Sequence, residues 1–188
     1  SYNFIILRDT LDFMKSIGCY LCRSNNYRLI TKKSKYSIVK CDNCDFVFTT
    51  PIPNQEEIVM YYSKFDYKDS LSAEKVIRSD SKRSLEMISK HIKEKGELLD
   101  VGCGRGYFLD EARMLGWKTH GFDASKTITD YAENTLHLDF FCSDIFSFRP
   151  AKFFDLITLN QVIEHFVNPE QLINQCSKHL KKGGFLYI

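Results

Sequence analysis

Two pairs of cysteines near the start of the chain have the spacing of metal ligands. Cys19 and Cys22 form one Cys-x-x-Cys pair, Cys41 and Cys44 form another, and residues 23–40 lie between them. Four thiolates arranged as two such pairs are typical of a tetrahedral zinc site. Because the protein would fill all four ligand positions, we expect a structural zinc ion and not a catalytic one.

Two disulfides, or a redox-active pair, are competing interpretations of the same four cysteines. The chain holds seven cysteines, an odd total, and Cys103, Cys142 and Cys176 fall in expected core or loop positions. Disulfides are rare in reducing compartments, where such a pattern is more often a metal site. The metal interpretation is therefore preferred.

The segment between the cysteine pairs predicts a hairpin. Residues 27–31 and 36–40 alternate enough to form two strands, and Lys32–Lys35 form a polar turn between them. Two cysteine knuckles joined by a hairpin would make a zinc ribbon.

A glycine-rich turn in the middle of the chain is the second feature that could do chemistry. The apolar segment Leu98–Val101 runs directly into Gly102, Gly104 and Gly106, and a helical segment follows. Glycine allows a sharp turn and the close approach of a ligand to bare backbone, and the following helix presents unpaired N–H groups. We therefore predict an adenosine-containing ligand at this turn.

Spacing excludes two common ligands of such turns. The dinucleotide fingerprint needs a third glycine three residues after the second, where this chain has Tyr107. A P-loop needs a Lys-Ser or Lys-Thr pair directly after its last glycine, and none follows Gly106. The turn therefore fits neither NAD nor a nucleoside triphosphate.

Acidic residues follow the next two predicted strands. The strand at 117–122 ends at Asp123, where a carboxylate can accept hydrogen bonds from both hydroxyls of a ribose. The strand at 138–141 ends near Asp144 and Ile145. A single aspartate of this kind is usually a surface residue, but acids at two consecutive strand ends after a glycine turn indicate a ligand site.

The segment from Leu98 to Leu109, with Asp100 two residues before the first glycine, resembles motif I of class I S-adenosylmethionine (SAM) methyltransferases. The resemblance implies an α/β fold with a doubly wound, Rossmann-like core and SAM as the cofactor. It also implies cofactor-binding roles for Asp100, Gly102, Gly104 and Gly106 in the turn, Asp123 and Ala124 at the ribose, Asp144 and Ile145 at the adenine, and Asn160 and Gln161 at the methionine end.

Residues 160–166 resemble the motif after the fourth strand in the same family, where Glu-His is frequent. If this segment is helical, Gln161, Glu164 and His165 share one face. A neutral imidazole can take a proton from an acceptor, so His165 is the candidate general base, with capping or packing of the helix as the equal alternative. Ubiquinone-pathway O-methyltransferases have Glu where this chain has Gln161, so a divalent cation is not expected there.

The N-terminal arrangement of zinc ribbon, Pro51-x-Pro53 and Tyr61-Tyr62 resembles bacterial methyltransferases encoded among sugar, capsule and O-antigen genes, and also sugar C-methyltransferases. This resemblance implies a small-molecule acceptor, namely a sugar, a nucleotide-sugar or a cell-surface polysaccharide precursor. Tyr61, Tyr62 and Tyr67 are candidates for the wall of the acceptor site or for packing between ribbon and core.

The charge distribution leaves two other functions open. The formal net charge is +2, but residues 1–55 hold eight Lys/Arg and four Asp/Glu. This basic segment is compatible with an rRNA or tRNA methyltransferase that contacts RNA through the ribbon, although no arginine–aromatic strip for base stacking is apparent. A non-catalytic methyltransferase-fold partner subunit is the other alternative. No stretch approaches the roughly 20 apolar residues needed to span a bilayer, so we expect a cytoplasmic protein.

The elements divide into three expected regions: a zinc ribbon with a short leading helix in residues 1–55, a helical linker in 56–96, and the SAM-binding core in 97–188. The spacing of Leu85, Ile88 and Ile92 predicts the linker helix, which should pack on the sheet. Arg78 and Arg83 in this region are possible partners of the SAM carboxylate, with exposure to solvent as the default.

The end of the chain predicts one more helix and one more strand. Asn168 and Pro169 are typical of a helix start, Lys181–Gly184 of a helix end, and Phe185–Ile188 of a fifth strand. The sheet of the family that the chain resembles has seven strands, so we expect further sequence after this one.

Overall fold

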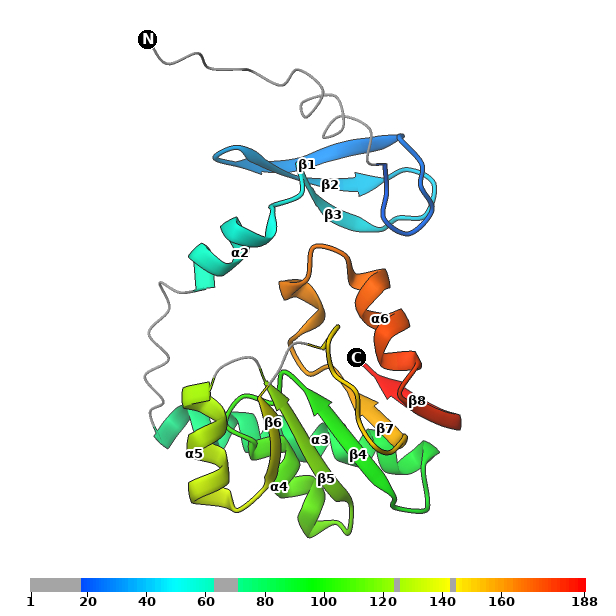
Figure 1. The fold of residues 1–188 in the computed structure, drawn as a ribbon. Coiled ribbons are helices and arrows are strands. Elements are labelled where there is room, and N and C mark those ends of the chain that lie inside the picture. The colour runs from blue at the N-terminus through cyan, green and yellow to red at the C-terminus, as the bar shows by residue number, and fades with distance from the viewer. Residues whose placement is uncertain (1–17, 63–70, 124–125, 143–144) are drawn as a thin grey trace. The chain divides into compact units, whose positions relative to one another are not determined.

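The computed structural model describes residues 18–62, 71–123, 126–142 and 145–188 (Figure 1). The expected leading helix before Gly18, and the predicted site residues Tyr67, Ala124 and Asp144, lie outside this part of the chain. No helix among the described residues combines the length and the apolar character that a membrane span requires.

The chain divides into two compact units, Ser1–Lys64 and Phe65–Ile188. The division groups helix α2 (Gln55–Tyr62) with the first unit and helix α3 (Leu71–His91) with the second. The three regions expected from the sequence stay a prediction.

The first unit is built on a three-stranded antiparallel sheet in the order β1-β2-β3. Its strands are β1 (Tyr27–Lys33), β2 (Tyr36–Cys41) and β3 (Val47–Thr50), and β1 and β2 form the predicted hairpin. Val39 of β2 pairs with Phe48 of β3, and both side chains are buried with Cys19 and Cys41. An apolar cluster of this size is a weak core for an independent unit, so we expect the cysteines to contribute to its stability.

The second unit is an open sheet of five strands, paired in parallel, in the order β6-β5-β4-β7-β8. The strands are β4 (Glu97–Val101), β5 (Lys118–Asp123), β6 (Asp139–Cys142), β7 (Phe154–Thr158) and β8 (Leu180–Tyr187). Besides α3, the helices are α4 (Tyr107–Met114), α5 (Lys126–Leu136) and α6 (Pro169–Ser177).

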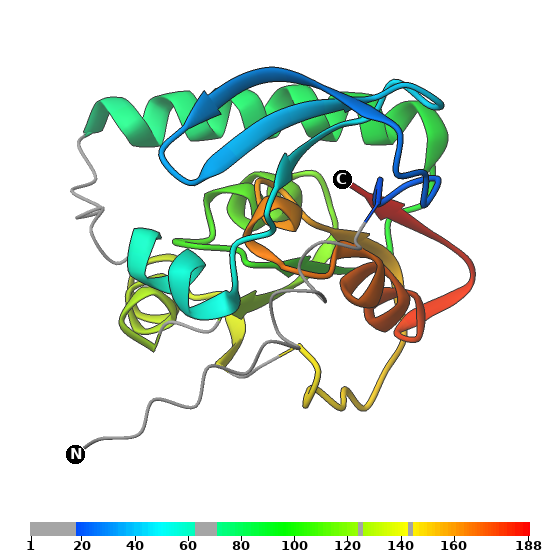
Figure 2. The same ribbon diagram turned by 90° about the horizontal axis from the view of Figure 1, so that it is seen from above.

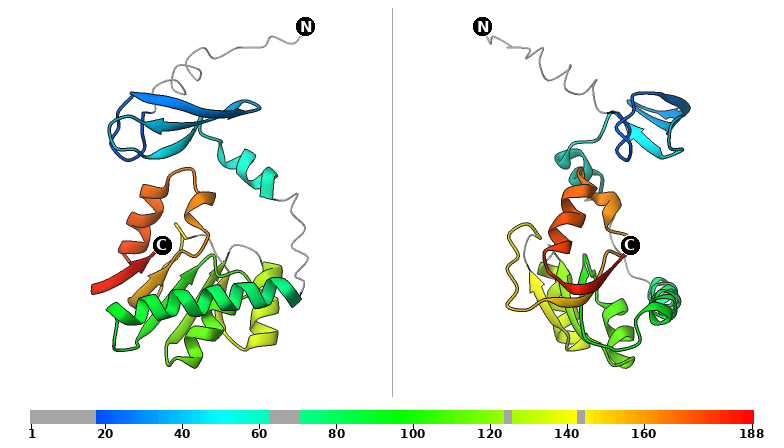
Figure 3. Two further views of the ribbon diagram at one scale, coloured as in Figure 1. Left: turned by 180° about the vertical axis from the view of Figure 1, so that it is seen from behind. Right: turned by 90° about the vertical axis from the view of Figure 1, so that its right-hand side faces the viewer.

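Both faces of this sheet are covered by helices, with α3 and α6 on opposite faces (Figure 2). Leu98 of β4 packs in one apolar cluster with Leu85 of α3 and Leu109 of α4. Its neighbour Leu99 packs in a second cluster with Leu172 of α6. Figure 3 shows α3 running across the strands that it covers. Successive residues of a strand point to opposite faces, so both must be apolar here. The predicted doubly wound α/β fold is confirmed.

The last helix begins as predicted but ends earlier. The N–H of Gln171 donates a hydrogen bond to Asn168 Oδ1 at 3.0 Å, and Pro169 is the first helical residue. The helix ends at Ser177, whereas Lys181–Gly184 belong to β8, so the predicted helix end at these residues is wrong. Gly183 has a φ of +81°, and the pairing of β8 with β7 shifts register in this region. The glycines thus accommodate an irregularity in a strand and do not cap a helix.

Candidate functional site

The predicted glycine turn joins β4 to α4. Gly102, Gly104 and Gly106 have φ angles of +70°, +52° and +80°, which residues with a Cβ rarely adopt. The N–H groups of Gly102 and Cys103 both donate to the carbonyl oxygen of Phe122, at 2.7 and 3.0 Å. The start of the turn is thereby tied to β5.

The three glycines have different surroundings. A Cβ on Gly102 would lie 2.5 Å from Val162 Cγ2, and a Cβ on Gly106 would lie 2.9 Å from Phe140 Cζ. At Gly104, no atom of the described residues other than Gly104 and its two chain neighbours lies within 4 Å of that position. Packing therefore requires glycine at the first and third positions, whereas the middle glycine leaves the backbone open to a ligand.

Asp123 lies at the carboxyl end of β5, next to the turn. Its Oδ2 accepts a hydrogen bond from the N–H of Gly104 at 3.1 Å. Ligands of open parallel sheets bind outside the carboxyl ends of the strands. The open glycine and the predicted ribose carboxylate therefore share the appropriate edge, and the role of Asp123 at a ribose stays a prediction.

Asp100 is buried directly before the turn. Its Oδ1 accepts hydrogen bonds from Thr158 Oγ1 at 2.6 Å and from Asn160 Nδ2 at 3.1 Å. Burial, assisted by the negative charge of Asp123, raises the pKa of Asp100 to about 7 against the opposite effect of the two hydrogen bonds. Asp100 thus connects β4 to the end of β7 and can carry a proton near neutral pH.

The segment after β7 meets the glycine turn at two points. Asn160 reaches the turn through its hydrogen bond to Asp100, and Val162 is the side chain next to Gly102. Sequence reasoning did not single out Thr158 or Val162. A threonine directly after Leu156 and Ile157, at the end of β7, was the available signal for the former.

The predicted helical face after β7 is wrong. Gln161 has a φ of +54°, in the left-handed region, and the following residues Ile163–His165 form a single 3₁₀ turn. A left-handed residue cannot continue a right-handed helix. Gln161 and Glu164 are exposed and His165 is half-buried, so the three do not share a helical face.

Ile145 is part of the core. Its side chain is buried in the apolar cluster that contains Val101 and Phe122, and its carbonyl oxygen accepts a hydrogen bond from Gln175 Nε2 at 3.3 Å. Its predicted contact with an adenine ring stays a prediction.

The two arginines considered as cofactor partners differ in environment. Arg83 is exposed, and its Nη1 lies 3.4 Å from Asp80 Oδ1. Arg78 faces α4, where it is paired with acidic side chains. Arg78 lies seven residues before Leu85 and therefore on the same, packed face of the helix. This spacing was the available signal that Arg78 is not exposed to solvent.

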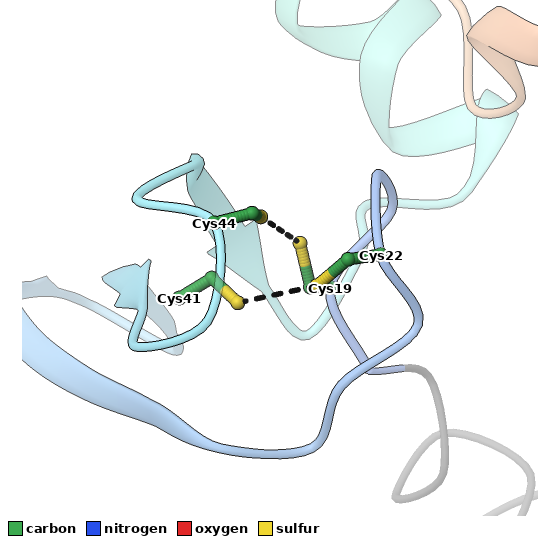
Figure 4. Close-up of side chains that lie close together, drawn as sticks. All are labelled: Cys19, Cys22, Cys41 and Cys44. Atoms are coloured by element: carbon green, nitrogen blue, oxygen red, sulfur yellow. Dashed lines mark hydrogen bonds between the residues drawn. The ribbon is translucent and has the colours of Figure 1, made fainter.

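The four predicted metal ligands lie together in the first unit (Figure 4). The sulfur atoms of Cys19, Cys22, Cys41 and Cys44 are all within 4.8 Å of one another, with 3.4 Å between Cys19 and Cys44 and 3.5 Å between Cys22 and Cys41. All four are free thiols, since a disulfide bond would be about 2 Å long. Tetrahedral zinc with Zn–S bonds of about 2.3 Å needs sulfur atoms roughly 3.8 Å apart. The cluster therefore fits zinc in ligand type and in spacing.

The two cysteine pairs also have matching backbone geometry. The N–H of Cys19 donates to the carbonyl oxygen of Ser24 at 2.7 Å, and the N–H of Cys41 donates to that of Phe46 at 2.8 Å. Arg23 and Asp45, each following the second cysteine of a pair, have φ angles of +63° and +61°. Two equivalent turns thus direct four sulfur atoms to one point, as two zinc knuckles do.

The second unit has a parallel sheet with a glycine turn at the carboxyl end of β4 and an acidic residue at the carboxyl end of the adjacent strand β5. These features define it as a Rossmann-like domain for a nucleoside-containing cofactor. Residues 74–188, more than half of the chain, match a family model described as a methyltransferase domain. The chain belongs to this methyltransferase family.

Relatives with known names agree with this assignment. A ubiquinone biosynthesis O-methyltransferase of Coxiella burnetii is 34% identical over 111 residues, which cover 55% of this chain and 47% of that protein. A ubiquinone biosynthesis O-methyltransferase of Pelagibacter ubique is 32% identical over 120 residues, which cover 61% of this chain and 48% of that protein. The chain thus spans about half the length of these curated relatives.

Solved structures share the fold. An amino pentose methyltransferase of Micromonospora echinaspora, with SAM bound, superimposes with a TM-score of 0.53 at 19% identity. The match covers 68% of this chain and 54% of the amino pentose methyltransferase.

Proposed function

We propose that this chain is a SAM-dependent methyltransferase that acts on a small-molecule acceptor. The observation that carries the proposal is the open position at Gly104 beside Asp123, at the carboxyl edge of β4 and β5. A nucleoside requires bare backbone to lie against and a carboxylate to accept the hydrogen bonds of its ribose. The methyltransferase family of the chain supports SAM as that nucleoside.

The residues around the turn would hold the cofactor by its separate parts. Asp123 and Ala124 would lie at the ribose, Asp144 and Ile145 at the adenine, and Asn160 and Gln161 at the methionine end. SAM, when bound, supplies an electrophilic methyl group on a sulfonium. The chain's own task is then to place the acceptor in line with that group and to accept its proton, and positioning alone accounts for much of the rate in such reactions.

His165 is the proposed general base. It follows directly after the segment that Asn160 and Val162 connect to the glycine turn, and a neutral imidazole is the side chain best suited to accept a proton near pH 7. His165→Ala is expected to abolish methyl transfer while leaving the affinity for S-adenosylhomocysteine unchanged. Equal turnover in wild type and variant would assign His165 to packing.

The acceptor is proposed to be a sugar, a nucleotide-sugar or a cell-surface polysaccharide precursor. Support comes from the order of elements, in which a four-cysteine ribbon precedes the methyltransferase domain as in the sugar-cluster methyltransferases that the chain resembles. The curated relatives are named ubiquinone biosynthesis O-methyltransferases, and their alignments cover 55% and 61% of this chain.

The four cysteines are proposed to bind one structural zinc ion. Four thiolates leave no open position for substrate, so the metal would stabilise the ribbon and take no part in methyl transfer. The matching turns of the two cysteine pairs support this assignment.

Calorimetric titration with S-adenosylhomocysteine tests the cofactor proposal without knowledge of the acceptor. We expect binding to the wild-type chain and a loss of at least about 10-fold in affinity for Asp123→Ala, because a charged hydrogen-bond acceptor is removed. The matched control is Asp139→Ala, which removes an exposed carboxylate at the amino end of β6. No binding to the folded chain would overturn the proposal and favour a non-catalytic partner subunit. Binding would justify screening nucleotide-sugars, with RNA as the comparison acceptor.

A further inference from the structure

Arg78 connects α3 to the beginning of α4. Its Nη1 donates to Asp110 Oδ2 and to Glu111 Oε1, each at 2.9 Å, and its Nε donates to Glu74 Oε1 at 2.8 Å. Its guanidinium carbon also lies 5.0 Å from the centre of the Tyr107 ring, within the range of a cation–π interaction. One side chain thus contacts three residues near the start of α4.

These contacts are shielded from solvent. The side chain of Arg78 is 22% exposed, that of Asp110 14% and that of Glu111 6%. Ion pairs in such surroundings are screened less than surface pairs, and the loss of one partner leaves a poorly solvated charge behind. Lys82 lies farther from Glu111, at 3.6 Å, and is itself exposed, so Arg78 is the main counter-ion of this buried carboxylate.

The start of α4 is also the end of the glycine turn. Tyr107 follows Gly106 directly and is buried, and the N–H of Asp110 donates to the carbonyl oxygen of Gly106 at 2.9 Å. The other end of the turn is tied to β5 through Phe122. The turn is therefore restrained by the sheet on one side and by the contacts of α4 with Arg78 on the other.

We propose that Arg78 is a positioning residue for the cofactor site, acting through Tyr107, Asp110 and Glu111 to keep the glycine turn in its binding geometry. The inference rests on the proposed function, because cofactor affinity is what the position of the turn determines. Arg83 is the natural comparison, since it lies on the same helix but is 73% exposed and pairs with an exposed aspartate.

The test compares two ligands, S-adenosylhomocysteine and adenosine, by calorimetry on the full chain. Arg78→Gln and Glu111→Gln are each expected to weaken both ligands by roughly 10-fold. The double variant should lose less affinity than the two single losses combined, because both substitutions remove the Arg78–Glu111 ion pair. Arg83→Gln should bind both ligands like wild type. Adenosine has no amino-acid carboxylate, so an equal loss for both ligands indicates a displaced turn.

Two results would overturn the proposal. A loss for S-adenosylhomocysteine but not for adenosine, with normal binding by Glu111→Gln, would show that Arg78 pairs with the ligand's carboxylate directly. Unchanged affinities with a lower unfolding temperature would leave Arg78 a purely structural role. Binding of neither ligand by the wild type would instead overturn the proposed function, and the inference with it.

A folding control keeps the test decisive. Trp117 is buried, and its backbone N–H donates to the carbonyl oxygen of Ala112 in α4, so its fluorescence reports whether α4 is packed. Where Arg78→Gln fails this control, Arg78→Lys replaces it. Lysine keeps the charge but cannot make the forked contacts of a guanidinium, so a smaller loss of affinity for both ligands is expected. Wild-type affinity in Arg78→Lys and in Glu111→Gln would count against the proposal.

Discussion

Asp100→Asn is expected to remove a pH dependence from the stability of the second unit. Burial of Asp100, together with the negative charge of Asp123, raises the pKa of the carboxyl group from 3.8 to about 7. Between these two values the native state holds a proton that the unfolded chain has lost. Asparagine has nearly the same shape and keeps an oxygen that can accept from Thr158 and Asn160, but it does not ionise.

The direction of the effect follows from proton binding. Between about pH 4 and pH 7 the native state binds more protons than the unfolded state, so the free energy of unfolding falls as the pH rises. One pKa unit corresponds to about 1.36 kcal/mol, and the contribution of Asp100 should therefore fall by about 2.5 kcal/mol between pH 5 and pH 8. Above pH 8 it should change little, because the native carboxyl is then ionised as well.

Urea unfolding at several pH values measures this contribution. Trp117 is the single tryptophan of the chain and is buried in the second unit, so its fluorescence follows that unit specifically. Burial lowers the pKa of His179, which makes stability fall with acidification below about pH 6.5 in both proteins. The quantity to compare is therefore the difference in the free energy of unfolding between the wild type and Asp100→Asn at each pH. Asp139→Asn, at an exposed position, is the control.

Parallel stability curves for the wild type and Asp100→Asn between pH 5 and pH 8 would refute the reasoning. They would mean that the hydrogen bonds from Thr158 and Asn160 outweigh burial, so that Asp100 is ionised in the native protein throughout this range.

The remaining predictions concern the metal and the glycines. Metal analysis should find about one zinc per chain, and chelation should unfold the first unit while the Trp117 transition persists; a metal-free chain with an ordered ribbon would contradict the zinc assignment. Gly102→Ala should lower the free energy of unfolding by about 2–4 kcal/mol, because its methyl group would meet Val162 at a positive φ, and Val162→Ala in the same chain should restore part of this loss. Gly104→Ala should lower the free energy of unfolding by only about 1 kcal/mol yet weaken S-adenosylhomocysteine binding. A larger loss of stability for Gly104→Ala than for Gly102→Ala would count against an open ligand position at Gly104.

Local patterns in the sequence were sufficient for most of the elements. The apolar segment before Gly102 predicted β4, the alternation around Lys32–Lys35 predicted the hairpin, and Asn168-Pro169 predicted the start of α6. Each of these signals acts over a few neighbouring residues, through propensity, turn geometry or capping. They are therefore readable without knowledge of the fold.

Local patterns failed where distant contacts compete with them. Lys181–Gly184 read as a helix end, but pairing with β7 draws the same residues into β8. Residues after Asn160 had helical spacing, but the hydrogen bond to Asp100 and the position of Val162 next to Gly102 accompany a left-handed Gln161 instead. Hydrogen bonds and packing between segments far apart in sequence can outweigh the small propensity differences of individual residues.

Residue types and short spacings were thus enough to indicate the type of chemistry: four thiols in two pairs, and a glycine turn with an acidic residue at the end of the next strand. Which side chains meet depends on the folded chain, in which Thr158 and Asn160 donate hydrogen bonds to Asp100 and Arg78 pairs with Asp110 and Glu111 of α4. Residue types and short spacings specify what a group can do. Burial and partners, which set its pKa and its position, arise when strands and helices separated by tens of residues pack together.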